Sequence, residues 1–115
     1  PQRKDTTMAD DKEPSGAEKM FGDLAPGLVH LTDDVLFGEV WRRPELSPRD
    51  RSLITVAALL TGGNTEQLVP HLGMAKANGL TEDELIEAIT HLAFYAGWPK
   101  AFSAMGVAKQ VFRGH

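Results

Sequence analysis

Cysteine is absent from the 115 residues of the chain. Without a thiol there can be no disulfide, no cysteine-ligated zinc or iron–sulfur site, and no thiolate nucleophile. Long apolar runs are missing too, since no stretch approaches the roughly 18 to 20 apolar residues of a membrane span. The first residues are polar and charged where a secretory signal would be apolar. We therefore expect a cytoplasmic protein with no membrane partner.

The chain also has fewer positively than negatively charged side chains. Twelve Lys and Arg stand against 16 Asp and Glu, which gives a net charge of −4. Duplex binding depends on Lys and Arg that neutralise phosphates, so this balance argues against a nucleic-acid partner. The 42% hydrophobic and 24% charged residues are typical of a folded domain, and the length fits one domain.

The first 16 residues differ from the rest. They are mostly charged or polar and contain almost no large apolar side chain, so they cannot bury enough surface to order themselves. We interpret residues 1–16 as a flexible N-terminal arm or linker and residues 17–115 as the folded domain. The arm is compatible with a native start at Met8 behind an added remnant, or with a linker from a preceding module.

In residues 17–115, capping residues, prolines and glycines are spaced as at the ends of helices. Apolar and polar residues do not alternate with a period of two over more than a few residues. Helices are expected over residues 17–23, from Pro26 towards Gly38, and from Ser47 to Gly62, with a connection over residues 42–46. Further helices should follow over residues 64–78, from Thr81 to Ala96, and from Pro99 to Phe112. The prediction is an all-α fold, a compact bundle of five to six short antiparallel helices with short connections.

Several of these boundaries rest on capping residues. Ser47 and Pro48 form a strong helix start, and Thr81 and Glu84 are spaced as a capping box. Asn64 and Gln67 have the same spacing, although Pro70 should then kink the helix or delay its regular part to about residue 67.

Three stretches of the sequence resemble the carboxymuconolactone decarboxylase family. They are LFGEVWRRPEL (36–46), RDRSLITVA (49–57) and THLAFYAGWP (90–99), and residues 71–79 between them also fit. The resemblance spans roughly residues 21–112. It implies an all-helical fold shared with alkyl hydroperoxidase D, usually assembled as a trimer or hexamer.

The same resemblance distinguishes two chemistries. The peroxidase-like branch carries Cys-x-x-Cys followed four residues later by His, whereas this chain has Asn64 and Gln67 at the cysteine positions and retains His71. A thiol peroxidase is therefore excluded. The other branch resembles the enzyme that decarboxylates 4-carboxymuconolactone to an enol-lactone in protocatechuate catabolism, without cofactor or metal.

Decarboxylation of a small anionic lactone requires a cation for carboxylate, hydrogen-bond donors, and a proton donor that titrates near neutrality. His71 is the best candidate acid, because the ordinary pKa of histidine lies near 6.5. Gln67, one turn earlier, could orient the ring. The alternative is a buried histidine bonded to a backbone carbonyl.

Three arginines could each bind a carboxylate through two N–H donors of the guanidinium. They are Arg42, Arg49 and Arg51. Arg51, which shares a helix face with Thr55, is slightly favoured, and a surface ion pair is the usual alternative. Glu39 could be a base or could hold an arginine, including one across a subunit boundary.

Several aromatic residues could wall the pocket. His91 and Tyr95 lie inside the third motif beside Trp98, where Tyr95 would donate a hydrogen bond. Trp41 is a further candidate for substrate contact, although packing is the more common role for such a residue. Because so small a domain buries only part of its surface, a homo-oligomer is also expected, in which a partner subunit covers Trp41, Phe94, Trp98 and Phe102.

No metal ligand set is expected, because His71 and His91 lie twenty residues apart without a metal-binding pattern. The leading hypothesis is a cofactor-free decarboxylase. A different reaction on a lactone or carbonyl acid, such as isomerisation or hydrolysis, and a non-catalytic oligomer that binds a small molecule or acts as a scaffold remain alternatives. The sequence does not define the exact substrate.

Overall fold

The computed structural model describes residues 13–114. These residues are almost entirely helical and contain no strand, so the predicted all-α fold class is confirmed. Two compact units divide the chain, residues Pro1–Arg43 and Pro44–His115. The predicted arm lies mostly outside the described residues; its last residues precede the first described helix, and Gly16 begins that helix.

The N-terminal unit holds α2 (Gly16–Phe21), α3 (Pro26–His30), the π-helix η1 (Leu31–Phe37) and the 3-10 helix η2 (Val40–Arg42). The predicted helix from Pro26 thus changes its hydrogen-bond pattern at Leu31, which periodicity did not indicate. A Cβ atom at Gly38 would lie 2.4 Å from the carbonyl oxygen of Asp34, so the position that follows η1 requires glycine.

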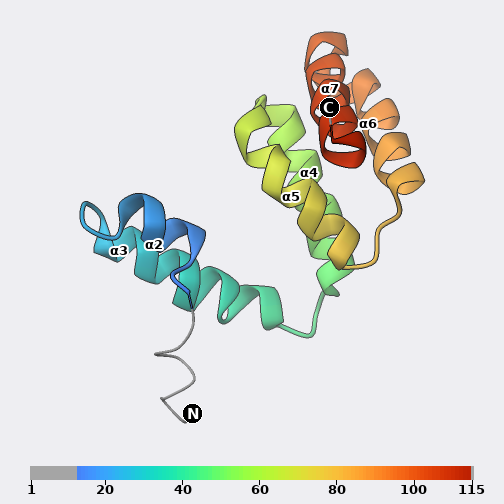
Figure 1. The fold of residues 1–115 in the computed structure, drawn as a ribbon. Coiled ribbons are helices and arrows are strands. Elements are labelled where there is room, and N and C mark those ends of the chain that lie inside the picture. Colours follow the sequence, from blue (N-terminus) through green and yellow to red (C-terminus); the bar gives the residue numbers. More distant parts are fainter. Residues whose placement is uncertain (1–12, 115) are drawn as a thin grey trace. The chain divides into compact units, whose positions relative to one another are not determined.

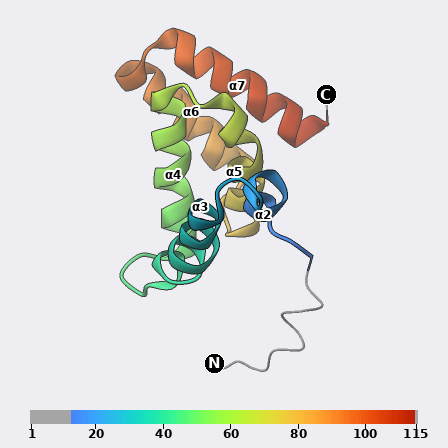
Figure 2. The same cartoon turned by 90° about the vertical axis from the view of Figure 1, so that its left-hand side faces the viewer.

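The C-terminal unit is built from α4 (Pro48–Gly62), α5 (Thr65–Ala77), α6 (Glu82–Ala96) and α7 (Trp98–Arg113). The helices run from green to red in Figures 1 and 2. α4 and α5 form an antiparallel hairpin, α6 packs against α4 and α7, and α7 also packs against α5. We call the α4–α5 pair the hairpin.

The capping residues explain most of the boundaries. Ser47 Oγ accepts a hydrogen bond from the backbone N–H of Asp50, and Thr81 with Glu84 forms the predicted capping box. Gly63, at φ 74°, ends α4 in the left-handed conformation that favours glycine.

α5 begins at Thr65 with Asn64 as its N-cap residue, as predicted, but the side chain of Asn64 makes no capping hydrogen bond. The alternative of a regular part delayed to about residue 67 is wrong, because the helix already runs from Thr65 and continues through Pro70. Proline removes the N–H that would bond to the carbonyl of Glu66. Both residues are exposed in the first turns of α5, where water can satisfy that carbonyl.

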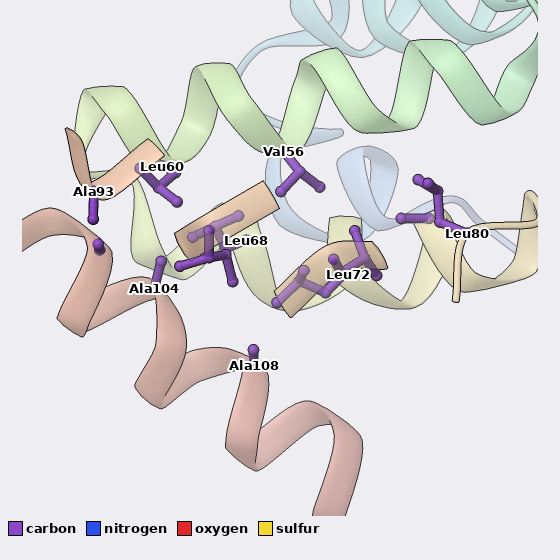
Figure 3. Packing of buried hydrophobic residues seen from close by; sticks show 12 residues of the cluster. Val56, Leu60, Leu68, Leu72, Leu80, Ala93, Ala104 and Ala108 are labelled. Carbon is purple, nitrogen blue, oxygen red and sulfur yellow. The ribbon is translucent and has the colours of Figure 1, made fainter. Parts of the chain in front are cut away.

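One apolar core joins the four helices (Figure 3). Alanines on α7 let that helix approach closely, while leucines fill the space between α4, α5 and α6. Leu92 and Ala96, on the same helix as Leu85 and Ile89, are only partly buried beside this core. The core residues are Val56, Leu60, Leu68, Leu72, Ala75, Leu80, Leu85, Ile89, Ala93, Ala101, Ala104 and Ala108.

Within residues 13–114, no helix combines the length and apolar character needed to cross a membrane. The part of the chain described here also contains no group of three or more His, Asp or Glu side chains arranged to hold a metal ion.

Replacing Leu72 by alanine should destabilise the protein by about 2–5 kcal/mol, because the fully buried side chain leaves a cavity that its neighbours cannot fill. Urea unfolding monitored by circular dichroism measures the loss. Val69→Ala, on the same helix but half exposed, is the control and should cost much less. Equal losses for the two variants would contradict the assigned core.

Candidate functional site

His71 occupies the middle of α5 and is half-buried, with its Nδ1 atom shielded from solvent. Burial lowers the pKa of His71 from its ordinary value of 6.5, because desolvation disfavours the charged imidazolium. The neutral ring is therefore favoured at neutral pH while no anion is near. The predicted acid thus has a shielded position and a perturbed pKa, both typical of functional histidines.

Arg51 lies in the second turn of α4 and is also half-buried, with its Nε atom shielded from solvent. Its side chain leaves the helix beside the fully buried Ser52. Thr55 Oγ1 donates a 2.7 Å hydrogen bond to the carbonyl oxygen of Arg51. That hydroxyl is therefore already engaged with the backbone of its own helix.

The side of α4 on which Arg51 lies follows from its neighbours. Leu53 lines a hollow shared with α6, and Ser52 faces the interior. Successive residues of a helix are turned by about 100°. Arg51, on the other side of Ser52 from Leu53, therefore lies on the flank of α4 that faces away from α6.

The side of α5 on which His71 lies also follows from its neighbours. Lys76 lies over the ring of Phe112, a residue of α7, with its Nζ atom 5.3 Å from the ring centroid. His71 precedes the buried Leu72 and lies on the opposite flank, away from α7. From this helix geometry we expect Arg51 and His71 to lie on one outer side of the hairpin, which we call the hairpin flank.

A buried polar contact sets the register of the two helices. Asn78 Nδ2 donates a 2.9 Å hydrogen bond to Ser52 Oγ, which joins the end of α5 to the start of α4. His71 lies seven residues before Asn78, or about 10 Å along the helix at a rise of 1.5 Å per residue. Because the side chain of arginine is long, a molecule the size of a lactone acid could contact both Arg51 and His71.

Sequence reasoning missed the Ser52–Asn78 contact. Ser52 is the buried polar residue of the described part of the C-terminal unit, at 1% exposure. A serine in the apolar stripe of a predicted helix was the available signal, because a buried hydroxyl requires a hydrogen-bond partner.

Arg49 and His91 lie elsewhere, in a hollow of about 470 Å³ between α4 and α6. Arg49 donates a 2.5 Å hydrogen bond to Glu84, and Glu87 lines the same hollow. The backbone N–H of Thr81 and then the Arg49 guanidinium hold the pKa of Glu84 below its usual value. With two carboxylates present, this hollow is poorly suited to an anionic ligand.

Tyr95 and Trp98 are exposed, at 77% and 51%. The Tyr95 ring lies 4.9 Å from that of His91, and Trp98 forms an edge-to-face pair with Phe94 at 5.2 Å. Within one chain, Tyr95 and Trp98 do not share the hairpin flank. Gln67 is exposed one turn before His71, on the same side of α5.

Glu39, Trp41 and Arg42 belong to the N-terminal unit. Glu39 is exposed and precedes η2, and Arg42 is exposed at the end of η2. Trp41 is half-buried, with its ring 5.6 Å from that of Phe37. Packing within its own unit is therefore one role of Trp41, and the roles of all three residues in a site stay predictions.

The lowered pKa of His71 predicts a pH-dependent stability. As pH falls below about 6.5, the unfolded chain binds a proton at this histidine before the folded chain does. Stability from His71 is therefore complete above pH 6.5 and declines as pH falls towards the lowered pKa. His71→Gln should remove this part of the decline when urea unfolding is measured between pH 8 and pH 5.

His91→Gln, a change of the same type at an exposed position, is the control and should keep the wild-type decline. An identical pH dependence in the wild type and in His71→Gln would show that burial of His71 has no such effect.

Residues 26–110 match the model of the carboxymuconolactone decarboxylase family. The chain is 47% identical over 108 residues to a 4-carboxymuconolactone decarboxylase of Acinetobacter baylyi, covering 94% of this chain and 81% of that protein. It is 38% identical over 85 residues to a nitrosuccinic acid decarboxylase of Metarhizium robertsii, covering 74% of this chain and 59% of that protein.

Proposed function

We propose that this chain, which belongs to the carboxymuconolactone decarboxylase family, is a carboxy-lyase acting on 4-carboxymuconolactone or a related small lactone carboxylate. The observation that carries the proposal is the 47% identity over almost the whole chain to a protein of that activity. The second relative is also named as a decarboxylase, of a different acid, so loss of carbon dioxide is the shared chemistry. The hairpin flank supplies residues for it.

Arg51 holds a carboxylate of the substrate. A guanidinium presents two parallel N–H donors that match the two oxygens of a carboxylate, and shielding from water strengthens that pair. Arg49 is less suited to this role, because it lines a hollow that also contains the carboxylates of Glu84 and Glu87. The preference for Arg51 among the three arginines is therefore part of the proposal.

Decarboxylation of this substrate needs no added electron acceptor, because the lactone itself accepts the electron pair. The bond between the ring carbon and the departing carboxylate breaks, and its electron pair moves through the adjacent double bond towards the lactone carbonyl. The resulting enolate then takes a proton on carbon, which yields the enol-lactone and carbon dioxide. Since the substrate's own carbonyl receives the electrons, we propose that the reaction needs no cofactor.

His71 donates the proton that the enolate takes up. Its pKa is lowered in the empty protein, but a dianion bound beside the ring favours the imidazolium. Substrate binding would therefore charge the acid at the moment when a proton is required. Gln67 on the same side of α5 would orient the ring, and Tyr95 and Glu39 remain proposed contributors whose placement requires the assembled protein.

The assembly and the location belong to the same proposal. We propose a homo-oligomer, a trimer or hexamer, in which Trp41, Trp98 and Arg42 contribute to substrate contact. His91 is a weaker candidate for this role, because it lines the hollow that contains Glu84 and Glu87. The chain would act in the cytoplasm on an intermediate of aromatic catabolism, in line with the activity named for its bacterial relative.

The assay of choice incubates the purified protein with 4-carboxymuconolactone and follows loss of the lactone and release of carbon dioxide. His71→Gln should lower kcat by about 10²–10⁴-fold, the usual contribution of a general acid. Arg51→Gln should lower kcat/KM far more than Arg49→Gln, its matched control, because only Arg51 lies on the hairpin flank.

Wild-type rates in both His71→Gln and Arg51→Gln would contradict these roles. Turnover of the lactone without carbon dioxide would favour the isomerase or hydrolase alternative. No turnover of any lactone carboxylate, with tight binding retained, would favour the non-catalytic alternative.

A further inference from the structure

The hydrogen bond from Asn78 to Ser52 joins two side chains to which the proposed reaction gives no role. Ser52 is almost completely buried, and the core residues around it on α4, α5 and α6 are apolar. An alanine would fill nearly the same volume and would bring no hydroxyl into the interior that needs a partner. The serine therefore requires an explanation other than packing.

The end of α5 does not depend on the side chain of Asn78. Gly79, at φ 109°, follows it in a conformation that favours glycine. The backbone N–H of Leu80 then donates a 3.0 Å hydrogen bond to the carbonyl oxygen of Ala75, as in the usual closure of a helix by glycine. The Asn78 amide is therefore not needed as a helix cap, and it bonds to α4 instead.

The contact is placed to align the two proposed site residues. Ser52 directly follows Arg51 on α4, and Asn78 lies seven residues after His71 on α5. Seven residues at about 100° each fall only about 20° short of two full turns, so His71 and Asn78 lie on nearly the same side of α5. A shift or rotation of α5 against α4 therefore moves His71 with Asn78 and leaves Arg51 with Ser52.

Apolar packing alone leaves room for such a shift. Leu68 and Leu72 of α5 share the core with Val56 and Leu60 of α4, and cores of this kind repack after small displacements. The 2.9 Å hydrogen bond is lost when its two atoms move apart by about 1 Å. In coiled coils, a single buried polar residue fixes the register of paired helices in the same way.

We propose that Asn78 is a positioning residue of the candidate site. Through Ser52, it holds α4 and α5 in the alignment in which one small anion contacts both Arg51 and His71. The inference rests on the proposed function, because it uses the roles given there to these two side chains. Asn78 acts through the alignment of the helices and does not itself touch the substrate.

The test separates alignment from stability. Asn78→Leu keeps nearly the shape of asparagine but leaves the buried Ser52 hydroxyl without this partner, so the midpoint of urea unfolding should fall. Ser52→Ala/Asn78→Leu removes both polar groups and should recover most of that loss. Asn64→Leu is the matched control, because it makes the same change at the exposed start of α5.

Turnover of 4-carboxymuconolactone should not recover with stability. We expect kcat to fall about 10–100-fold in Asn78→Leu and to stay as low in Ser52→Ala/Asn78→Leu, since a misplacement of about 1 Å has an effect of this size. KM should change less, because Arg51 alone can still hold a carboxylate. Asn64→Leu should keep the wild-type kcat.

The titration of His71 gives a second measurement that needs no substrate. NMR follows the histidine ring signals with pH, and the spectrum of His71→Gln identifies the signal that belongs to this residue. Burial lowers the pKa of His71 in the wild type. In Ser52→Ala/Asn78→Leu, the altered alignment should open the ring to water and move this pKa towards 6.5, whereas Asn64→Leu should leave it unchanged.

Two outcomes would overturn the proposal. If kcat recovers together with stability in Ser52→Ala/Asn78→Leu, the contact contributes to stability alone. If the pKa of His71 is the same in this variant as in the wild type, the helices keep their alignment without the contact. A wild type that does not decarboxylate the lactone would instead contradict the proposed function, and the titration would then decide by itself whether Asn78 aligns the helices.

Discussion

The antiparallel contact of α4 with α5 is the feature on which the candidate site depends. On its inner side, Val56, Leu60, Leu68 and Leu72 are almost completely buried. At one end, the hydrogen bond from Asn78 to Ser52 fixes the register of the two helices. Since burial alone tolerates a shift along the helices and a buried hydrogen bond does not, the polar contact specifies the alignment that apolar packing stabilises.

This alignment separates two electrostatic environments that lie only two residues apart on α4. Arg49 turns towards α6, where Glu84 neutralises its charge. Arg51 turns to the hairpin flank, on which His71 follows on the neighbouring helix. The hollow towards α6 contains the carboxylates of Glu84 and Glu87, whereas Arg51 lies on another side of the same helix. Helical periodicity thus gives two similar arginines different surroundings.

Local sequence signals were sufficient to predict a helix start where the capping residues lie close together in the sequence and contact each other. Ser47 with Asp50 and Thr81 with Glu84 are such cases, and both helix starts were predicted correctly. Local signals did not predict the course of a helix where solvent access or a change of hydrogen-bond pattern determines it. The carbonyl opposite Pro70 is open to water, so α5 continues, and the π-helix η1 leaves no periodic trace.

The candidate site shows the same division. His71 and Arg51 were identified from their chemistry and from the family motifs, but their common flank follows only from the way in which α4 packs on α5. The spacing of Arg49 and Arg51 could not reveal that Glu84, 35 residues further along the chain, accepts from one of them. The same limit applies to Tyr95, which shares a sequence motif with Trp98 but lies on the outer face of α6.

The residues along α5 differ in solvation. Asn64 and Gln67, which stand where the resemblance puts the two cysteines of the peroxidase-like branch, are exposed near the start of the helix. His71 lies one turn further along, where burial lowers its pKa. The protonation of His71 therefore depends on its own desolvation rather than on the exposed side chains at the helix start. In the proposed function, an anionic substrate beside the ring would counter that desolvation, so the proposed role of His71 requires no thiol on α5.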